Sequence, residues 1–335
     1  MKAVVLQEEK NFQSLVLSEV PDPLPGPVEA LVEIKAAALN MRDIWIIKGE
    51  YPNIKVPVIL GSDGAGVVKE VGDKVDRKWI NKSVIINPGI NWGNDTKVQQ
   101  KDYQIFGTPK NGTHAEYIVV PAENLREKPT NLTFEECAAI SLAGLTGYRA
   151  LFTQGNLQSN ETLLITGIGG GVATLMLQMA IAKNAQVCVT SGSEEKIEMA
   201  KKSGARGGVN YKTGDWDKQI IALAGNDGID LIVDGAGGPG FNQLISIIKP
   251  GGRIVSYGAT TGKPSDIQLH KIFWKQITIQ GTTMGSNQDF EEMIEYFSNS
   301  DILPVIHKKF SLVDFRSAYL ELMNGKQFGK IVLIP

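Results

Sequence analysis

Cysteine is scarce in this chain, whose 335 residues include only two, Cys137 and Cys188. They lie 51 positions apart, each within an apolar segment. Cysteines placed in this way indicate buried free thiols rather than a disulfide framework. Because free thiols persist in a reducing compartment, we expect a cytoplasmic protein.

Long apolar runs and an excess of one charge are also missing. No apolar stretch approaches the ~20 residues that span a bilayer. The N-terminal segment 1–12 turns polar and acidic too early for a signal peptide. Lys and Arg number 34 against 36 Asp and Glu, for a formal net charge of −2. Neither nucleic acid nor a membrane is therefore an expected partner, whereas a small-molecule substrate is.

What is present is the composition of a folded globular protein, with 42% hydrophobic residues and 36 glycines. A chain of this length exceeds one ordinary compact core, so we expect two domains. The first 125 residues favour β-structure, with short strands predicted over 30–36, 66–72 and 83–87. The segment 91–109 is polar and is predicted to be a loop.

From about residue 160, strand-like and helical patterns alternate. Apolar runs rich in Val, Ile and Leu mark the predicted strands at 162–166, 186–190, 229–233, 252–256 and 276–280. Runs without strict polar alternation are typical of parallel strands buried on both faces. Their alternation with helices predicts an α/β domain with a doubly wound parallel sheet, that is, a Rossmann fold.

The helix between the second and third of these strands has clear end signals. Ser193 is a suitable N-cap, and Gly204 stands where a glycine commonly follows a helix. Glu198 and Lys202 are predicted to form an ion pair four residues apart. After residue 285 we expect two further helices and a final strand.

A glycine-rich loop at 167–173 joins the first of these strands to a helix. A pyrophosphate needs close approach of the backbone and unpaired N–H groups at a helix N-terminus, and such a loop supplies both. Glycines also serve ordinary turns, but here the preceding strand, the following helix and a second strand occur in the required order. We therefore expect the dinucleotide to be bound by Gly167, Gly169, Gly170, Gly171 and Val172.

The tip of the second strand bears on the choice of cofactor. An acidic residue there would bind the ribose hydroxyl of NAD, but this chain has Thr-Ser-Gly-Ser at 190–193. The absence of a carboxylate removes the repulsion that a 2′-phosphate would feel. We predict NADPH, with its phosphate held by Ser191, Gly192, Ser193, Lys196 and Tyr211. Ser193 can cap the helix at the same time.

Seven segments together resemble the medium-chain dehydrogenase/reductase superfamily, and specifically its zinc-free, quinone-oxidoreductase-like branch. They are ALNMRD (38–43), LGSDGAGVVKEVGDKV (60–75), GTHAEYIVV (112–120), LAGLTGYRAL (142–151), GIGGGVA (167–173), GGRIVSYG (251–258) and GKIVLIP (329–335). Each segment alone is modest evidence for this resemblance. Their order and spacing carry the resemblance over essentially the whole chain.

This resemblance implies a GroES-like β-barrel catalytic domain over 1–125, completed by 285–335, and a Rossmann domain over 126–284. It implies further cofactor contacts from Thr146, Gly258, Gly329 and Lys330. It also implies a homodimer formed through the strand at 276–280, whose edge would otherwise need cover.

Zinc-dependent members of the same superfamily hold a catalytic zinc through Cys, His and Cys. The matching positions are Asn40, Ser62 and about Leu142, none of which is a good zinc ligand. Asp63 matches a nearby acidic residue of the family, but one carboxylate cannot hold zinc, and the four cysteines of a structural zinc lobe are absent from 88–109. The histidines, none with a ligand-like spacing, are His114, which we interpret as structural, His270 and His307. We expect no metal.

Without a metal, oxidising an alcohol is hard because nothing stabilises the alkoxide. Reducing an electron-poor C=C bond or a quinone is easier, since hydride adds to carbon while hydrogen-bond donors stabilise charge on oxygen. Candidate donors are Asn40, Tyr51 and Arg42, although Asn40 could instead brace its loop. Arg42 is expected to form an ion pair with Asp43. Tyr51 matches a proposed proton donor of similar enoyl reductases, and is equally open to interpretation as a wall of the site.

Three functions stay open at this point. The first is an NADPH-dependent reductase of quinones or α,β-unsaturated carbonyl compounds. The second is a zinc-type alcohol dehydrogenase-like protein, and the third is a non-enzymatic NADPH-binding relative. Trp92, Tyr103 and Phe106 favour the first, because a substrate-facing loop at 88–109 with these rings suits unsaturated or aromatic carbonyl compounds.

Overall fold

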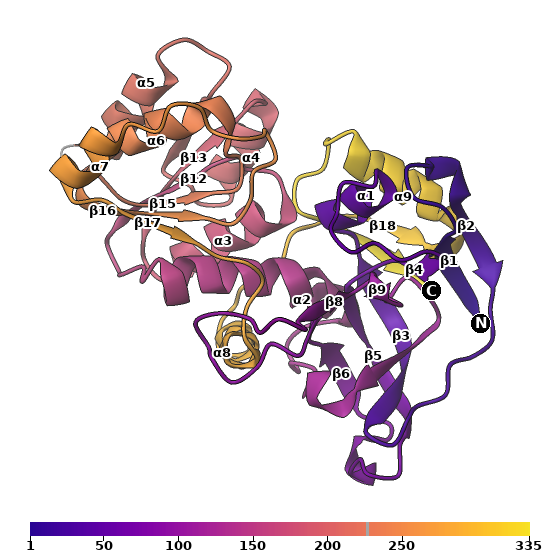
Figure 1. Cartoon of the computed structure of the whole chain (residues 1–335). Coiled ribbons are helices and arrows are strands. Elements are labelled where there is room, and N and C mark those ends of the chain that lie inside the picture. The colour runs from indigo at the N-terminus through magenta and orange to yellow at the C-terminus, as the bar shows by residue number, and fades with distance from the viewer. Residues whose placement is uncertain (226–227) are drawn as a thin grey trace. The chain divides into compact units, whose positions relative to one another are not determined.

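The computed structural model describes residues 1–225 and 228–335, which fall into two compact units. Unit 1 comprises Met1–Ala143 and Ser286–Pro335, and unit 2 comprises Gly144–Gly285; Figure 1 labels many of their elements. Unit 1 extends past the boundary at 125 expected from the sequence. It includes the first part of helix α2 (Phe134–Tyr148), up to Ala143, where the backbone N–H of Leu142 donates to Asp63 Oδ1 at 2.7 Å.

Unit 1 is built on a seven-stranded sheet in the order β11-β6-β5-β3-β19-β18, with β10 also paired to β3. Its strands are β3 (Glu29–Ala38), β5 (Asp63–Val71), β6 (Ser83–Ile86), β10 (Tyr117–Pro121), β11 (Leu125–Glu127), β18 (Ile306–Ser311) and β19 (Lys330–Ile334). A three-stranded sheet contains β1 (Lys2–Leu6), β2 (Leu15–Glu19) and β4 (Val58–Ile59), and another contains β7 (Gly89–Ile90), β8 (Gln104–Phe106) and β9 (Pro109–Lys110). Besides the first part of α2, the helices of unit 1 are α1 (Met41–Ile47), α8 (Asn287–Ser298) and α9 (Phe315–Met323).

The C-terminal strand completes the main sheet of unit 1. Strand β19 pairs antiparallel with β3, so that Val332 lies opposite Ala38. This pairing carries Lys330 to the end of β3, where the chain enters α1. Residues nearly three hundred positions apart in sequence thus share one corner of the unit.

Unit 2 is a six-stranded parallel sheet in the order β14-β13-β12-β15-β16-β17. Its strands are β12 (Thr162–Ile165), β13 (Gln186–Ser191), β14 (Gly207–Asn210), β15 (Ile229–Asp234), β16 (Ile248–Ser256) and β17 (Thr278–Gly281). Its helices are α3 (Gly171–Ala182), α4 (Glu194–Lys202), α5 (Trp216–Ala224), α6 (Phe241–Ile247) and α7 (Leu269–Lys275). Helix α3 runs along one side of the sheet and α6 and α7 along the other (Figure 1). The predicted fold class, a GroES-like domain and a Rossmann domain, is confirmed.

Local details depart from the sequence interpretation in two places. Helix α4 begins at its predicted cap, since Ser193 Oγ accepts from the backbone N–H of Lys196 at 3.4 Å. Glu198, however, pairs with Lys201 at 2.6 Å instead of Lys202, because residues three apart are also neighbours on a helix. The segment 91–109 also contains a strand, β8, where a loop was expected.

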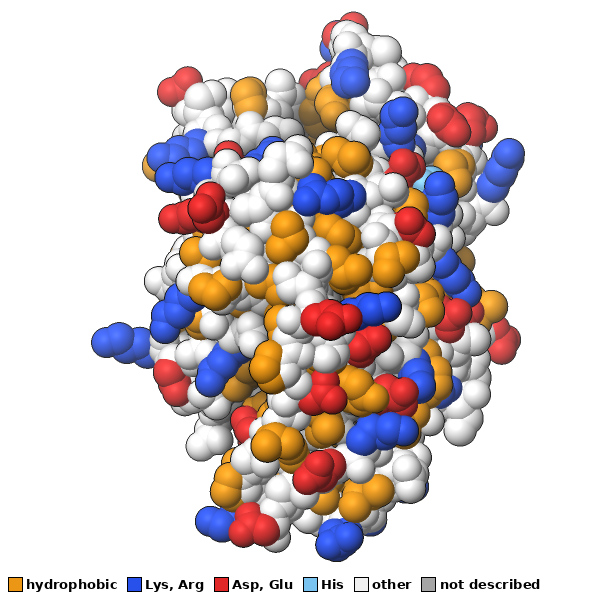
Figure 2. Space-filling model, turned by 90° about the vertical axis from the view of Figure 1, so that its right-hand side faces the viewer, with side chains coloured by type: hydrophobic (Ala, Val, Ile, Leu, Met, Phe, Trp, Pro, Cys, Tyr) orange, Lys and Arg blue, Asp and Glu red, His pale blue; other side chains and the backbone are white. Residues whose placement is uncertain are grey.

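Both cysteines are buried free thiols, as expected. Burial raises the pKa of Cys137 to about 12 and that of Cys188 to about 11, so neither thiol ionises near neutral pH. Among the described residues, none of the helices is both long and apolar enough to cross a membrane. On the face drawn in Figure 2, basic and acidic side chains are interspersed.

Candidate functional site

The first part of the candidate site is the turn where β3 ends and α1 begins. Asp43 is fully buried, and its Oδ2 accepts a hydrogen bond from the backbone N–H of Asn40 at 2.8 Å. A carboxylate in the first turn of a helix also faces the positive end of the helix dipole. Asp43 therefore fixes the backbone that presents Asn40.

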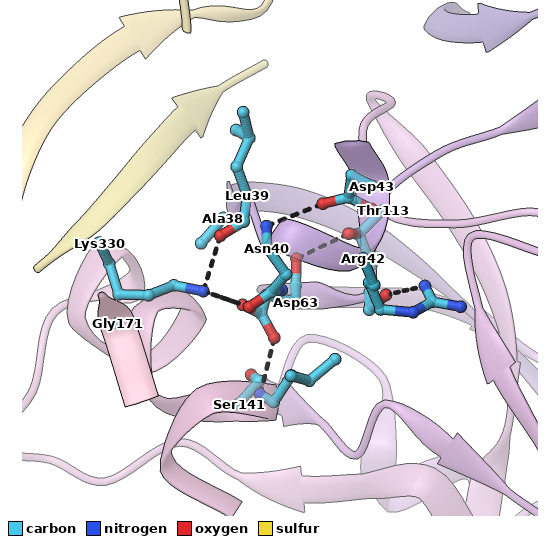
Figure 3. Close-up of polar contacts among 12 residues, drawn as sticks. Ala38, Leu39, Asn40, Arg42, Asp43, Asp63, Thr113, Ser141, Gly171 and Lys330 are labelled. Carbon is cyan, nitrogen blue, oxygen red and sulfur yellow. Dashed lines mark hydrogen bonds and ion pairs between the residues drawn. The ribbon is translucent and has the colours of Figure 1, made fainter. Parts of the chain in front are cut away.

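Asn40, Asp63 and Lys330 form a buried hydrogen-bonded network (Figure 3). The Lys330 ammonium donates to Asn40 Oδ1 at 2.7 Å, to Asp63 Oδ2 at 2.8 Å and to the Leu39 carbonyl oxygen at 2.8 Å. Asn40 Nδ2 donates to Asp63 Oδ2 at 2.8 Å, and Leu142 N–H donates to the other carboxylate oxygen. Burial raises the pKa of Asp63, while the ammonium and the two N–H donors act against this and favour the ionised carboxylate.

Arg42 is held on the other side of the same turn. Its Nη1 donates to the Phe106 carbonyl oxygen at 2.6 Å and also to Ser62 Oγ, which in turn donates to the same carbonyl at 2.8 Å. The Tyr51 ring lies over the guanidinium at 4.7 Å. The predicted ion pair with Asp43 is wrong: the described residues include no such pair, because the Asp43 carboxylate turns back to the Asn40 backbone.

The structure brings together the three positions that match the zinc ligands of the family. The residues there do not fit a zinc ion, since zinc prefers thiolate or imidazole ligands. Asn40 Oδ1 already accepts from the Lys330 ammonium, Ser62 Oγ is bonded to the Arg42 guanidinium, and Leu142 offers only a backbone N–H. In the part of the chain that the structure describes, no group of three or more His, Cys, Asp or Glu side chains is placed to hold a metal ion.

The aromatic residues of segment 88–109 are not all available to a substrate. Trp92 and Phe106 are 3% and 2% exposed, and Phe106 belongs to the hydrophobic core of unit 1. The Trp92 and Tyr103 rings pack edge to face, with centroids 5.2 Å apart. The expectation that Trp92 and Phe106 face a substrate is therefore wrong, because Phe106 is buried in the core of unit 1 and Trp92 is buried against Tyr103.

His114 has a place in the interior of unit 1. It is fully buried, and its Nδ1 lies 2.8 Å from the hydroxyl of Tyr319 on α9. Burial lowers the pKa of His114, which favours the neutral imidazole. A Cβ at Gly61 would collide with this ring, so the glycine makes room for it. These contacts agree with the structural interpretation of His114.

The second part of the candidate site is the glycine loop of unit 2. Gly167 and Gly169 have φ angles of +67° and +120°, in the region of positive φ that favours glycine. Helix α3 begins at Gly171, and no side chain caps its N-terminus. Open space surrounds the positions that a Cβ would take at Gly167 and Gly170. This open space fits a dinucleotide pyrophosphate, because the first N–H groups of a helix have no partner within it; Val172 lies in this first turn.

Basic and hydroxyl groups surround the end of β13, where a 2′-phosphate is predicted. Ser191 Oγ accepts from the backbone N–H of Ser193 at 3.3 Å. A Cβ at Gly192 would lie 2.8 Å from the Tyr211 hydroxyl and 2.7 Å from Lys212 Cε. Lys212 was missed by sequence reasoning, although it directly follows Tyr211.

Lys196 lies against the glycine loop, since a Cβ at Gly169 would stand 3.1 Å from its ammonium nitrogen. Burial lowers the pKa of Lys196. The remaining expected cofactor residues are spread over both units. Thr146 is buried on α2 and Gly258 follows β16 in unit 2, while Gly329 and Lys330 belong to unit 1. All three Lys330 N–H bonds are directed at the protein.

Comparison with known proteins gives the family. Residues 26–130 match the alcohol dehydrogenase GroES-like domain, and residues 171–299 match the zinc-binding dehydrogenase model. A zinc-type alcohol dehydrogenase-like protein of Leptosphaeria maculans, YogA, is 36% identical, over 96% of this chain and 95% of its own. The chain belongs to the medium-chain dehydrogenase/reductase superfamily.

Other members of this superfamily carry different activities in their names. An acryloyl-coenzyme A reductase of Sulfurisphaera tokodaii is 30% identical over the full length of both chains. The crystal structure of an NAD-dependent alcohol dehydrogenase is 35% identical, with a TM-score of 0.93 and full coverage of both chains. As a medium-chain dehydrogenase/reductase, the protein is an oxidoreductase for which NAD(P) binding is expected.

Proposed function

We propose that the protein is an NADPH-dependent, zinc-independent reductase that transfers hydride to a quinone or an α,β-unsaturated carbonyl compound. The observation that carries this proposal is how the side chains at the positions of the family's zinc ligands are hydrogen-bonded in this chain. Two cationic side chains, Lys330 and Arg42, already hold the oxygen atoms of Asn40 and Ser62 there. A site organised around fixed cations and N–H donors suits charge development on a substrate oxygen.

The chain's residues divide the chemical tasks. When bound, the reduced nicotinamide supplies the hydride. The Gly167–Val172 loop with the start of α3 would hold the pyrophosphate, and Lys196, Lys212 and Tyr211 would hold the 2′-phosphate. In unit 1, Asn40 offers an N–H to the substrate's carbonyl oxygen. Arg42 adds a fixed positive charge, and Tyr51 over it is the candidate proton donor.

A zinc-type alcohol dehydrogenase activity is the second candidate, and the name of the 36% identical relative favours it. The name of the acryloyl-coenzyme A reductase favours reduction of an activated C=C bond. The ligand chemistry of Asn40, Ser62 and Leu142 argues against zinc in this chain.

The test is a screen of NADPH oxidation against quinones, enones, enals and enoyl thioesters, run beside alcohol oxidation with NAD and NADP. We expect turnover of at least one electron-poor C=C or quinone substrate by chelator-washed protein, with no gain on adding zinc. Stoichiometric zinc in the washed protein, or activity on alcohols alone, would favour the second candidate.

Tyr51→Phe separates the two roles open to Tyr51. The substitution keeps the ring over Arg42 but removes the hydroxyl. If Tyr51 donates the proton, turnover falls ~10²-fold or more, the usual contribution of a general acid, while NADPH binding measured by fluorescence is unchanged. Unaltered turnover would make Tyr51 a wall of the site.

We also propose that the protein is a homodimer joined through β17. This strand ends the sheet of unit 2 and pairs only with β16 among the described strands, and all its residues are exposed. Phe273 and Trp274, on the preceding helix α7, are 68% and 82% exposed. Proteins normally cover an open strand edge and large exposed aromatic rings, and a second copy of the same strand can cover this edge.

A further inference from the structure

The Asn40 amide has only one orientation that its neighbours permit. Its Oδ1 accepts from the Lys330 ammonium at 2.7 Å, and its Nδ2 donates to Asp63 Oδ2 at 2.8 Å. Turning the amide over would set its NH₂ group against the ammonium and its oxygen against the carboxylate. Both contacts would be repulsive, so the hydrogen-bond network itself assigns the two ends of the amide.

Lys330 and Asp63 are in turn fixed by their own partners. The ammonium has three N–H bonds and three acceptors, and Lys330 is 3% exposed. Asp63 is fully buried, and its second oxygen accepts from Leu142 N–H at 2.7 Å. A buried ion pair whose hydrogen bonds are all satisfied does not rearrange easily, because any change exposes an unpaired charge to a low-dielectric interior.

The arrangement leaves Asn40 with one unused polar group. Nδ2 carries two hydrogen atoms, of which one is bonded to Asp63. The described residues provide no partner for the second. The oxygen of the amide is occupied by the ammonium, and Ser62 Oγ nearby is engaged by Arg42 and the Phe106 carbonyl.

We propose that Lys330 and Asp63 are positioning residues. They fix the Asn40 amide so that it can act toward a substrate only as a hydrogen-bond donor, never as an acceptor. This rests on the proposed function and narrows its substrate class. An amide that can donate through its nitrogen, while its oxygen is already occupied, suits a carbonyl oxygen that gains negative charge. Such charge develops in the enolate formed when hydride adds to the β-carbon of an enone. It does not suit an alcohol, whose hydroxyl proton must be accepted before or during hydride loss.

A double-mutant cycle tests whether Lys330 acts through Asn40. NADPH-dependent reduction of 2-cyclohexen-1-one is measured for the wild type, N40A, K330M and the double variant. Removal of one such donor commonly costs ~10²-fold in kcat, and we expect each single variant to lose about that with little change in KM for NADPH. The double variant should fall no more than ~2-fold below N40A, since distant, independent sites would add instead. Fully additive losses would overturn the proposal.

Two further variants keep the test informative. K330M alone leaves Asp63 buried without its partner, which can destabilise the fold. K330M combined with D63N removes both charges, and it replaces K330M in the cycle if the single variant fails to fold. Lys309→Met on the neighbouring strand β18 is the matched control, since Lys309 is a surface residue paired with Glu135. It should leave kcat unchanged.

A spectroscopic measurement separates this inference from the reductase proposal. Protein labelled with ¹⁵N-asparagine gives side-chain amide signals, and the Asn40 pair is assigned by its loss in N40D. We expect two widely separated proton shifts, one of them far downfield from its bond to the Asp63 carboxylate, and collapse of the separation when K330M and D63N are combined. An ordinary, averaged Asn40 signal in the wild type would overturn the inference even in an active enzyme. A fixed amide in a protein that reduces no enone would retain the positioning and reject the proposed function.

Discussion

Individual side chains in this protein are defined by the charges placed beside them. Asn40 is a neutral amide, yet Lys330 and Asp63 decide the orientation of its two polar atoms, since Oδ1 accepts from the ammonium and Nδ2 donates to the carboxylate. Arg42 likewise owes its position to the Ser62 hydroxyl and the Phe106 carbonyl oxygen, not to the adjacent carboxylate. Sequence proximity of Arg42 and Asp43 was therefore a poor guide, because consecutive helical residues point in different directions.

Lys196 provides a residue-scale prediction about the cofactor. Its ammonium lies against Gly169 of the glycine loop, where a phosphate is expected. Lys196→Ala removes a charged hydrogen bond of ~1.5–3 kcal/mol, the usual range for such groups. We expect kcat/KM for NADPH to fall about 10–100-fold and that for NADH to change little, as measured by steady-state kinetics. Lys202→Ala, in the exposed last turn of the same helix, is the control.

An equal loss with NADPH and NADH would contradict a 2′-phosphate role for Lys196. It would instead place the ammonium on the pyrophosphate that both cofactors share. No loss with either would remove Lys196 from the cofactor site.

At the scale of elements, the buried parallel strands were the most predictable part of the fold. The runs at 162–166 and 186–190 coincide with β12 and β13 within one residue, since such strands are apolar on both faces. The lobe at 88–110 was not predictable, because β7 and β9 are only two residues long. A pattern of alternating polarity needs about four residues to be visible.

The start of α8 gives an element-scale prediction. Ser286 Oγ accepts from the backbone N–H of Asp289 at 3.1 Å, and Asp289 Oδ2 accepts from that of Ser286 at 2.7 Å. Ser286→Ala removes the capping hydroxyl, and we expect it to cost about 1 kcal/mol. A lower midpoint of urea unfolding, followed by circular dichroism, measures the loss. Ser298→Ala at the other end of α8 should not shift the midpoint, because Ser298 only donates to a helical carbonyl.

On the scale of the whole molecule, the site in unit 1 depends on contacts that local sequence patterns cannot reveal. Asn40 and Asp63 could be predicted as neighbours from the family's zinc positions. The contact between Lys330 and Asn40 spans 290 positions and follows only from the insertion of β19 beside β3. The Leu142 backbone N–H donates to one oxygen of Asp63, and the identity of a side chain does not predict such a backbone contact.

The open edge of unit 2 leads to a prediction about assembly. A charged residue on an edge strand or beside it opposes pairing with a second copy. We expect the wild type to sediment as a dimer, and the double variant Trp274→Glu, Ile279→Lys to sediment as a monomer at micromolar concentration in analytical ultracentrifugation. Leu24→Glu is the matched control, because Leu24 is as exposed as Trp274, at 82%, but lies in unit 1. A monomeric wild type, or a double variant that remains dimeric, would refute assembly through β17.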